Sequence, residues 1–98
     1  IRKFFEWINK AANAGNSEAM TQVAIAYRDG EGTDLNLDEF FRWIKKSAEE
    51  GNSEAMTQLA FAYRDGEGTD PNLDEFFKWI KKSANAGNPG RTAQLHAR

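Results

Sequence analysis

Cysteine is absent from the 98-residue sequence, and histidine occurs only once. Without cysteine the chain can form no disulfide bridge, no Cys-X-X-Cys redox pair and no thiolate zinc site. The single histidine, His96, has no cysteine or serine partner in a recognisable arrangement, so we interpret it as a solvated residue and not as part of a catalytic dyad. The sequence therefore predicts no catalytic residue and no cofactor.

Long apolar runs and clusters of basic residues are absent as well. No run of about 18 apolar residues exists, so we expect no membrane insertion. Lysine and arginine alternate with aspartate and glutamate, and the net charge is −2 at pH 7. Because binding to a phosphate backbone usually needs clustered cations, the sequence disfavours a nucleic-acid partner. The chain opens at Ile1 without an initiator methionine or a signal-peptide pattern, so we expect a fragment of a longer protein.

A repeat of 36 residues dominates the sequence. Residues 15–50 and 51–86 differ at six of 36 positions, and residues 1–14 align with residues 37–50. A period of about 20–50 residues is typical of stacked repeats, in which each unit buries its apolar face against its neighbours. We therefore expect one domain over residues 1–98, composed of a half repeat (1–14), two full repeats (15–50 and 51–86) and a partial repeat (87–98).

The first half of each repeat has the periodicity of an amphipathic helix. Apolar residues from Ala19 to Tyr27 recur at intervals of three and four, which predicts a helix over about residues 18–28. Asn16 is a suitable N-cap, and Gly15 stands where the preceding helix ends in positive φ. We call this element helix A and expect it again in the second repeat.

The second half of each repeat predicts another amphipathic helix, helix B, over about residues 37–50 in the first repeat. Asn36 and Glu39 have the spacing of a capping box, in which each side chain bonds the backbone N–H of the other residue. Asp38 and Arg42 have the i, i+4 spacing of a helical ion pair.

Three tryptophans, one period apart, lie within the apolar stripe of helix B: Trp7, Trp43 and Trp79. A ladder of rings for ligand stacking is one interpretation. Their apolar surroundings favour the other, a hydrophobic core between helical hairpins. Lys45 and Lys46, near the end of helix B, are most simply solvated residues that oppose the helix dipole.

The loops between helix A and helix B, residues 29–34 and 65–70, each contain two glycines and three carboxylates. An EF-hand loop needs ligands at alternate positions, glycine at the sixth and glutamate at the twelfth, and this spacing fails that test. A nucleotide-binding loop needs a preceding strand and a following Gly-Lys-Ser/Thr, which are also missing. We therefore predict tight turns with unusual glycine angles, and no metal ion.

The sequence after Gly87 departs from the repeat. Asn88 keeps the cap position of a third helix A, but Gly90 and Arg91 replace the glutamate and alanine that open helix A in both repeats. A charged side chain at a helix contact where both repeats have alanine predicts a fraying end or a polar cap over residues 91–98.

Taken together, these residues resemble the Sel-1-like repeats, a branch of the tetratricopeptide-type helical hairpins. The matching residues of the second repeat are Ala55, Leu59, Tyr63, Gly66, Gly68, Trp79, Lys82, Ala84 and Gly87. The resemblance covers the full chain and implies an all-α, right-handed α-solenoid of antiparallel helix-turn-helix repeats. It also implies that helix A lines a concave groove and that the protein assembles protein complexes.

The sequence departs from this family pattern at several positions. Ala60 stands where the family usually has glycine, and Phe76 and Ser83 stand where it usually has alanine. The large ring of Phe76 occupies a position that the family keeps small, so we expect hairpin spacing or superhelical curvature to differ from that of relatives. Because the chain lacks cysteine, it also differs from the disulfide-stapled members linked to β-lactam binding.

The face of helix A opposite its alanine and tyrosine stripe is the candidate site for a partner. In a stack, the faces of the two repeats align into a polar strip with Ile25 and Phe61 as apolar anchors, which suits an extended peptide or a partner helix. The alternative is that both anchors pack against adjacent repeats. The predicted partner-binding residues are Glu18, Thr21, Gln22, Ile25, Arg28, Asp29, Glu54, Thr57, Gln58, Phe61, Arg64 and Asp65.

The sequence thus predicts a non-catalytic scaffold that binds a protein or peptide on the concave helix A face. An enzyme would need a cleft of convergent titratable groups, which the repeated surfaces do not provide. The alternative is an architectural or self-associating segment of a longer solenoid. It draws support from ends that carry no polar cap, because a terminal repeat without one is expected to associate end to end.

Overall fold

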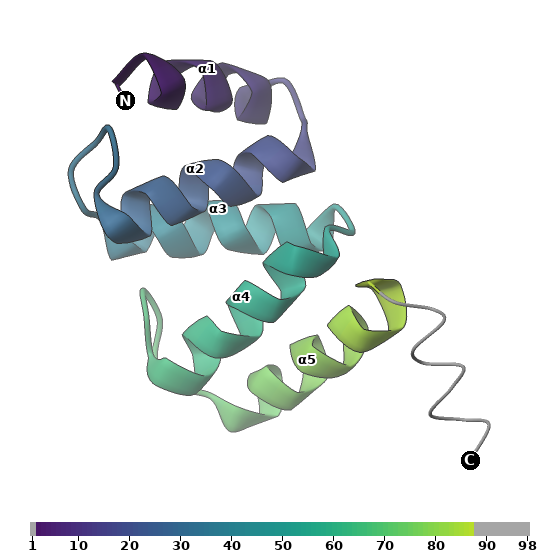
Figure 1. The fold of residues 1–98 in the computed structure, drawn as a ribbon. Coiled ribbons are helices and arrows are strands. Elements are labelled where there is room, and N and C mark those ends of the chain that lie inside the picture. Colours follow the sequence, from purple (N-terminus) through teal and green to yellow (C-terminus); the bar gives the residue numbers. More distant parts are fainter. Residues whose placement is uncertain (1, 88–98) are drawn as a thin grey trace.

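The computed structural model describes residues 2–87, which form five α-helices and no strand (Figure 1). The helices are α1 (Arg2–Asn13), α2 (Ser17–Asp29), α3 (Leu37–Glu49), α4 (Ser53–Asp65) and α5 (Leu73–Gly87). α2 and α4 correspond to helix A, and α1, α3 and α5 to helix B. The expected third helix A and His96 lie outside the described residues.

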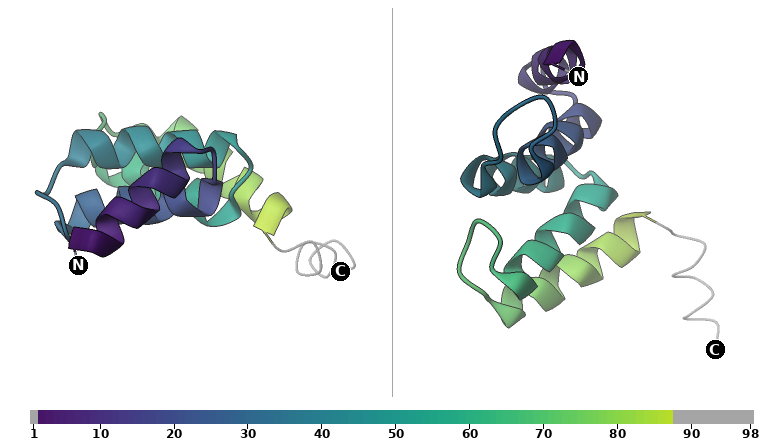
Figure 2. Two further views of the ribbon diagram at one scale, coloured as in Figure 1. Left: turned by 90° about the horizontal axis from the view of Figure 1, so that it is seen from above. Right: turned by 60° about the vertical axis from the view of Figure 1, so that its left-hand side comes forward.

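The helices stack in the order of the chain. Each helix packs against the next one, from α1 against α2 to α4 against α5. α1 lies at one end of the row and α5 at the other (Figure 2). The chain is therefore an all-α helical repeat solenoid, as its period predicts.

Asparagine side chains cap the helices as the sequence predicts. Asn16 Oδ1 accepts a hydrogen bond from Ala19 N at 3.0 Å, and Asn36 Oδ1 accepts one from Glu39 N at 3.1 Å. The second half of the capping box is wrong, because Asn36 N donates to the Tyr27 carbonyl. The Glu39 carboxylate instead accepts from Arg42 Nη2 at 2.6 Å, so the ion pair expected between Asp38 and Arg42 is wrong as well.

The two glycines of the loop between α4 and α5 have different roles. Gly66 caps α4 with φ +74° and donates its N–H to the Ala62 carbonyl at 2.8 Å. Gly68 also has φ +74°, and a Cβ there would meet the Leu37 carbonyl and lie 2.8 Å from Phe41 Cβ. The second glycine thus lets the loop close onto the start of the preceding helix B, which a larger residue would prevent.

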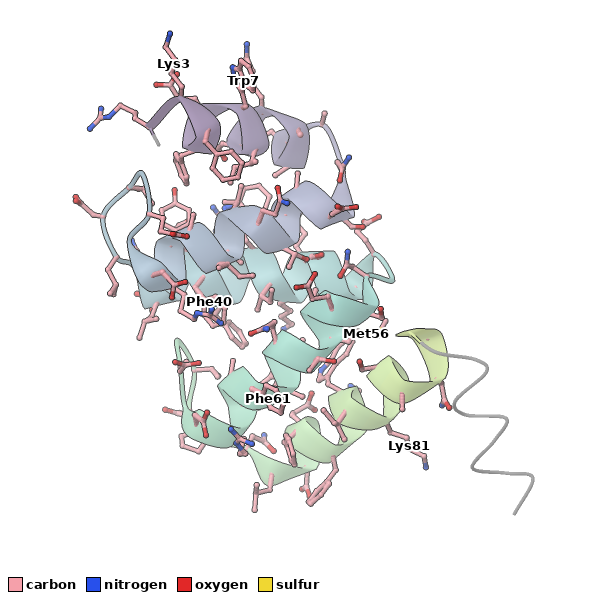
Figure 3. The ribbon with its side chains drawn as sticks, viewed as in Figure 1. Lys3, Trp7, Phe40, Met56, Phe61 and Lys81 are labelled. Carbon is pink, nitrogen blue, oxygen red and sulfur yellow. The ribbon has the colours of Figure 1, made fainter. Side chains whose placement is uncertain are left out.

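The core combines alanine side chains with larger apolar ones. Leu59 and Phe40 are fully buried, and Trp43 and Trp79 are 5% and 6% exposed, as predicted for core residues. Trp7 is 74% exposed, so the core interpretation is wrong for this residue. α3 lies between α2 and α4, whereas α1 lies at the end of the row, so no described helix covers the side from which Trp7 projects (Figure 3).

Candidate functional site

We call the twelve predicted partner-binding residues of α2 and α4 the A strip. A hydrogen bond joins its two halves, since Arg28 Nη1 near the end of α2 donates to Gln58 Oε1 in the middle of α4 at 2.9 Å. Thirty residues separate these two side chains in the sequence. The polar surfaces of the two A helices therefore meet at this point.

Two threonines of the A strip turn inward. Thr21 is 1% exposed, and its hydroxyl lies 2.8 Å from the hydroxyl of Ser47. The Ser47 hydroxyl donates a hydrogen bond to the Ser17 carbonyl at 2.7 Å. The expectation that Thr21 lies on the exposed face of helix A is wrong, because its hydroxyl contacts Ser47 between α2 and α3. Thr57 is half-buried and makes the same contact with Ser83.

The apolar anchors of the A strip, Ile25 and Phe61, are both half-buried. The ring of Phe61 stacks on Phe76 of the following helix, with centroids 6.5 Å apart and an interplanar angle of 27°. The Arg64 guanidinium lies over the same Phe61 ring at 4.7 Å from its centroid. Phe61 thus packs within its own helical hairpin and keeps part of its surface in solvent.

The charges of the A strip are largely paired along each helix. Arg28 contacts Asp29 at 3.1 Å, and Arg64 contacts Asp65 at 2.9 Å. The hydrogen bond from Arg64 lowers the pKa of the Asp65 carboxyl, which stays ionised at neutral pH. Because these pairs cancel, the exposed Glu18 and its counterpart Glu54 give the strip its net negative charge.

A pocket of about 330 Å³ opens between α1 and α2 at one end of the A strip. Glu18 and Gln22 of the strip form one wall, and exposed Phe4 and Trp7 form part of the other. The predicted partner-binding residues do not include Phe4 and Trp7, although the sequence offered Trp7 as part of an aromatic ladder.

The outer surfaces of α3 and α5 hold cations against tryptophan rings. Arg42 and Lys46 lie 5.2 Å and 5.4 Å from the centroid of Trp43, and the Trp79 ring has the same arrangement with Lys78 and Lys82. Such contacts contribute about 0.5–1 kcal/mol each at exposed sites. The lysine of each helix end is therefore more than a solvated charge, because it also covers an aromatic ring.

No group of three or more histidine, cysteine or carboxylate side chains within residues 2–87 is placed to hold a metal ion. None of the helices formed by these residues is both long and apolar enough to cross a membrane.

The Sel1 repeat family model matches residues 5–16, 17–52 and 53–88. The fold is similar to the crystal structure of a Sel1 repeat protein from Oxalobacter formigenes, with 28% identity and a TM-score of 0.85. The alignment covers 89% of this chain and 36% of that one.

Two further solved structures have the same fold. The first is c5321, a protective antigen of uropathogenic Escherichia coli strains, with 26% identity and a TM-score of 0.85 over 89% of this chain and 19% of that one. The second is Helicobacter pylori cysteine rich protein B, with 18% identity and a TM-score of 0.83 over 87% of this chain and 64% of that one. The chain thus spans about a third and a fifth of the first two proteins. No curated protein sequence matches it.

Proposed function

The chain belongs to the Sel1 repeat family, and we propose that it is a non-catalytic scaffold that binds a peptide or a partner protein on the A strip. Repeats of this family are generally protein–protein interaction modules. The proposal rests on the hydrogen bond from Arg28 to Gln58, which joins the polar faces of α2 and α4 into one surface. A partner that lies along this surface contacts both repeats.

The chemistry of the A strip suits a polypeptide partner. Half-buried Ile25 and Phe61 offer apolar contacts, and exposed Gln22 offers an amide that can both donate and accept hydrogen bonds. Peptide recognition commonly combines such apolar anchors with a polar surround. The binding part of the strip excludes Thr21 and Thr57, whose hydroxyls are already used.

A random 12-residue peptide library, displayed on phage and selected against the full chain, tests the proposal. We expect selected peptides to lose at least tenfold in affinity when Gln22 and Phe61 are both changed to alanine. The matched control changes Lys45 and Lys81, on the exposed outer surface of α3 and α5, to alanine. Equal affinity for the wild-type chain and the strip variant would exclude the strip as the binding surface.

A second candidate function is architectural: the domain over residues 1–98, with its half repeat, two full repeats and partial repeat, acts as a self-associating segment of a solenoid. Exposed aromatic residues on the first and last described helices favour it, since Phe4 and Trp7 of α1 and Phe77 of α5 are 55%, 74% and 60% exposed. Light scattering that shows a molar mass rising with protein concentration supports end-to-end association. A constant monomer mass argues against it.

A further inference from the structure

The acidic and basic residues are divided unevenly between the two kinds of helix. The A helices α2 and α4 and the loops after them, residues 17–36 and 53–72, contain eight carboxylates and two cations, Arg28 and Arg64. The B helices α1, α3 and α5 contain six carboxylates and nine lysines and arginines. The A helices with their loops therefore carry a strong negative charge, although the net charge of the whole chain is only −2.

Both cations of the A helices are bound to neighbouring side chains. Arg28 donates to Gln58 at 2.9 Å and to Asp29 at 3.1 Å. Arg64 donates twice to Asp65, at 2.9 Å and 3.2 Å. Each arginine thus has an aspartate that cancels its charge, so the remaining carboxylates of the A helices and their loops are not balanced by a cation there.

Four glutamates stand out among these remaining carboxylates. Glu18 and Glu54 are exposed in the first turns of α2 and α4, and Glu31 and Glu67 directly follow the glycines that cap the ends of these helices. None of the four forms an ion pair with another residue between 2 and 87. A helix dipole stabilises a carboxylate at the start of a helix but opposes one at its end. Local helix stability therefore accounts for the first pair and not for the second, which leaves attraction of a cation from outside the chain.

The apolar anchor of each A helix lies between two of these carboxylates. In α2, Ile25 comes seven residues after Glu18 and six residues before Glu31, and α4 has the same order around Phe61. Seven residues are almost two helical turns and about 10 Å along the axis, so the anchor and the first carboxylate lie on one face of the helix. A partner that places an apolar side chain on the anchor therefore has a carboxylate beyond each end of that contact.

We propose that the partner of the A strip is a cationic peptide segment, in which an apolar side chain is flanked by lysine or arginine. This inference rests on the proposed function and names the chemical class of the partner. The apolar side chain contacts Ile25 or Phe61, and the flanking cations lie near the carboxylates of the same helix and its loop. The negative charge also attracts such a segment over a distance and repels an acidic one, so this contribution weakens as the salt concentration rises.

The peptides selected on phage against the full chain provide the first test. We expect them to contain, on average, at least two more lysines and arginines than aspartates and glutamates. Their affinity for the chain should fall about fivefold or more between about 50 mM and about 500 mM sodium chloride, because salt screens exposed charges.

The second test removes charge from the A strip without changing the size of its side chains. We expect Glu18→Gln together with Glu54→Gln to weaken the binding of a selected peptide about three- to tenfold at low salt. The matched control is Asp38→Asn together with Asp74→Asn, in the first turns of α3 and α5. Both double variants have the same net charge, and the control should change the affinity less than about twofold.

Two outcomes would overturn the cationic partner and leave the proposed function in place. One is a set of selected peptides that lacks an excess of cations and still loses affinity when Gln22 and Phe61 are changed. The other is an equal loss of affinity in the two double variants, which would show a response to net charge alone. Peptides that are all insensitive to the changes at Gln22 and Phe61 would exclude the A strip itself and this inference with it.

Discussion

Arg28 Nη1 and Gln58 Oε1 lie 2.9 Å apart across the boundary between the two repeats. Because Arg28 lies near the end of α2 and Gln58 lies within α4, this bond joins the surfaces of two successive repeats. We expect Arg28→Ala and Gln58→Ala to show a coupling of about 1 kcal/mol in a double-mutant cycle measured by urea unfolding.

Arg64 provides the control for this cycle. It contacts Asp65 and the Phe61 ring on its own helix and the Phe76 ring of α5, so these contacts stay within one repeat. The changes Arg64→Ala and Gln58→Ala should therefore be additive within about 0.3 kcal/mol. Coupling of similar size in both cycles would show that the loss at Arg28 is not specific to the bond across the repeats.

The buried hydroxyls of Thr21 and Ser47 should also be coupled. Thr21→Val removes one hydroxyl of a close pair and should cost about 1 kcal/mol in the free energy of unfolding. Adding Ser47→Ala should cost less than the sum of the single changes, because an apolar pair leaves no side-chain polar group buried. Urea unfolding measures all three variants, and full additivity would argue against a direct interaction.

Gly68→Ala should be one of the most destabilising single changes in the loops. The residue has φ +74°, and its Cβ would collide with the Leu37 carbonyl and Phe41. Strain and overpacking together predict a loss of about 2–4 kcal/mol. Gly51→Ala is the matched control, since Gly51 has φ +100° and no atom within 4 Å of an added Cβ, so it should lose about 1–2 kcal/mol from backbone strain alone. Equal melting temperatures for the two variants would contradict this account of the loop.

Phe61→Ala separates binding from stability. Because Phe61 is half-buried, the change should cost about 1–2 kcal/mol in folding, and Leu59→Ala, at a fully buried site two residues away, about 2–5 kcal/mol. If Phe61 is an anchor of the A strip, Phe61→Ala should lower the affinity for captured peptides more than Leu59→Ala does. A folding loss as large as that of Leu59→Ala would instead identify Phe61 as a core residue.

The local features of the fold could be predicted from the sequence. Asn16 and Asn36 are strong N-caps wherever they precede a helix, so the helix starts were predicted within a residue or two. Glycine spacing likewise predicted the turn at Gly66. Because these signals act over a few residues, they do not depend on what lies elsewhere in the stack.

Features that depend on a neighbouring helix could not be predicted in the same way. Trp7 has the same local sequence position as Trp43, yet its exposure is decided by the absence of a described helix over α1. On a helical wheel Thr21 lies on the polar face of helix A, open to a partner. In the structure its hydroxyl contacts that of Ser47, which is 26 residues away in the sequence and lies on the next helix. Arg42 had two carboxylates within reach, and only the structure shows that it contacts Glu39.

Chemical-shift mapping of a phage-selected peptide on the isotope-labelled full chain tests the A strip most directly. We predict that the largest perturbations follow α2 and α4 together, at Gln22, Ile25, Gln58 and Phe61, and that Arg28→Ala weakens the perturbations on both helices. Perturbations confined to one helix, or centred on Lys45 and Lys81 of the outer surface, would contradict a continuous surface shared by the two repeats.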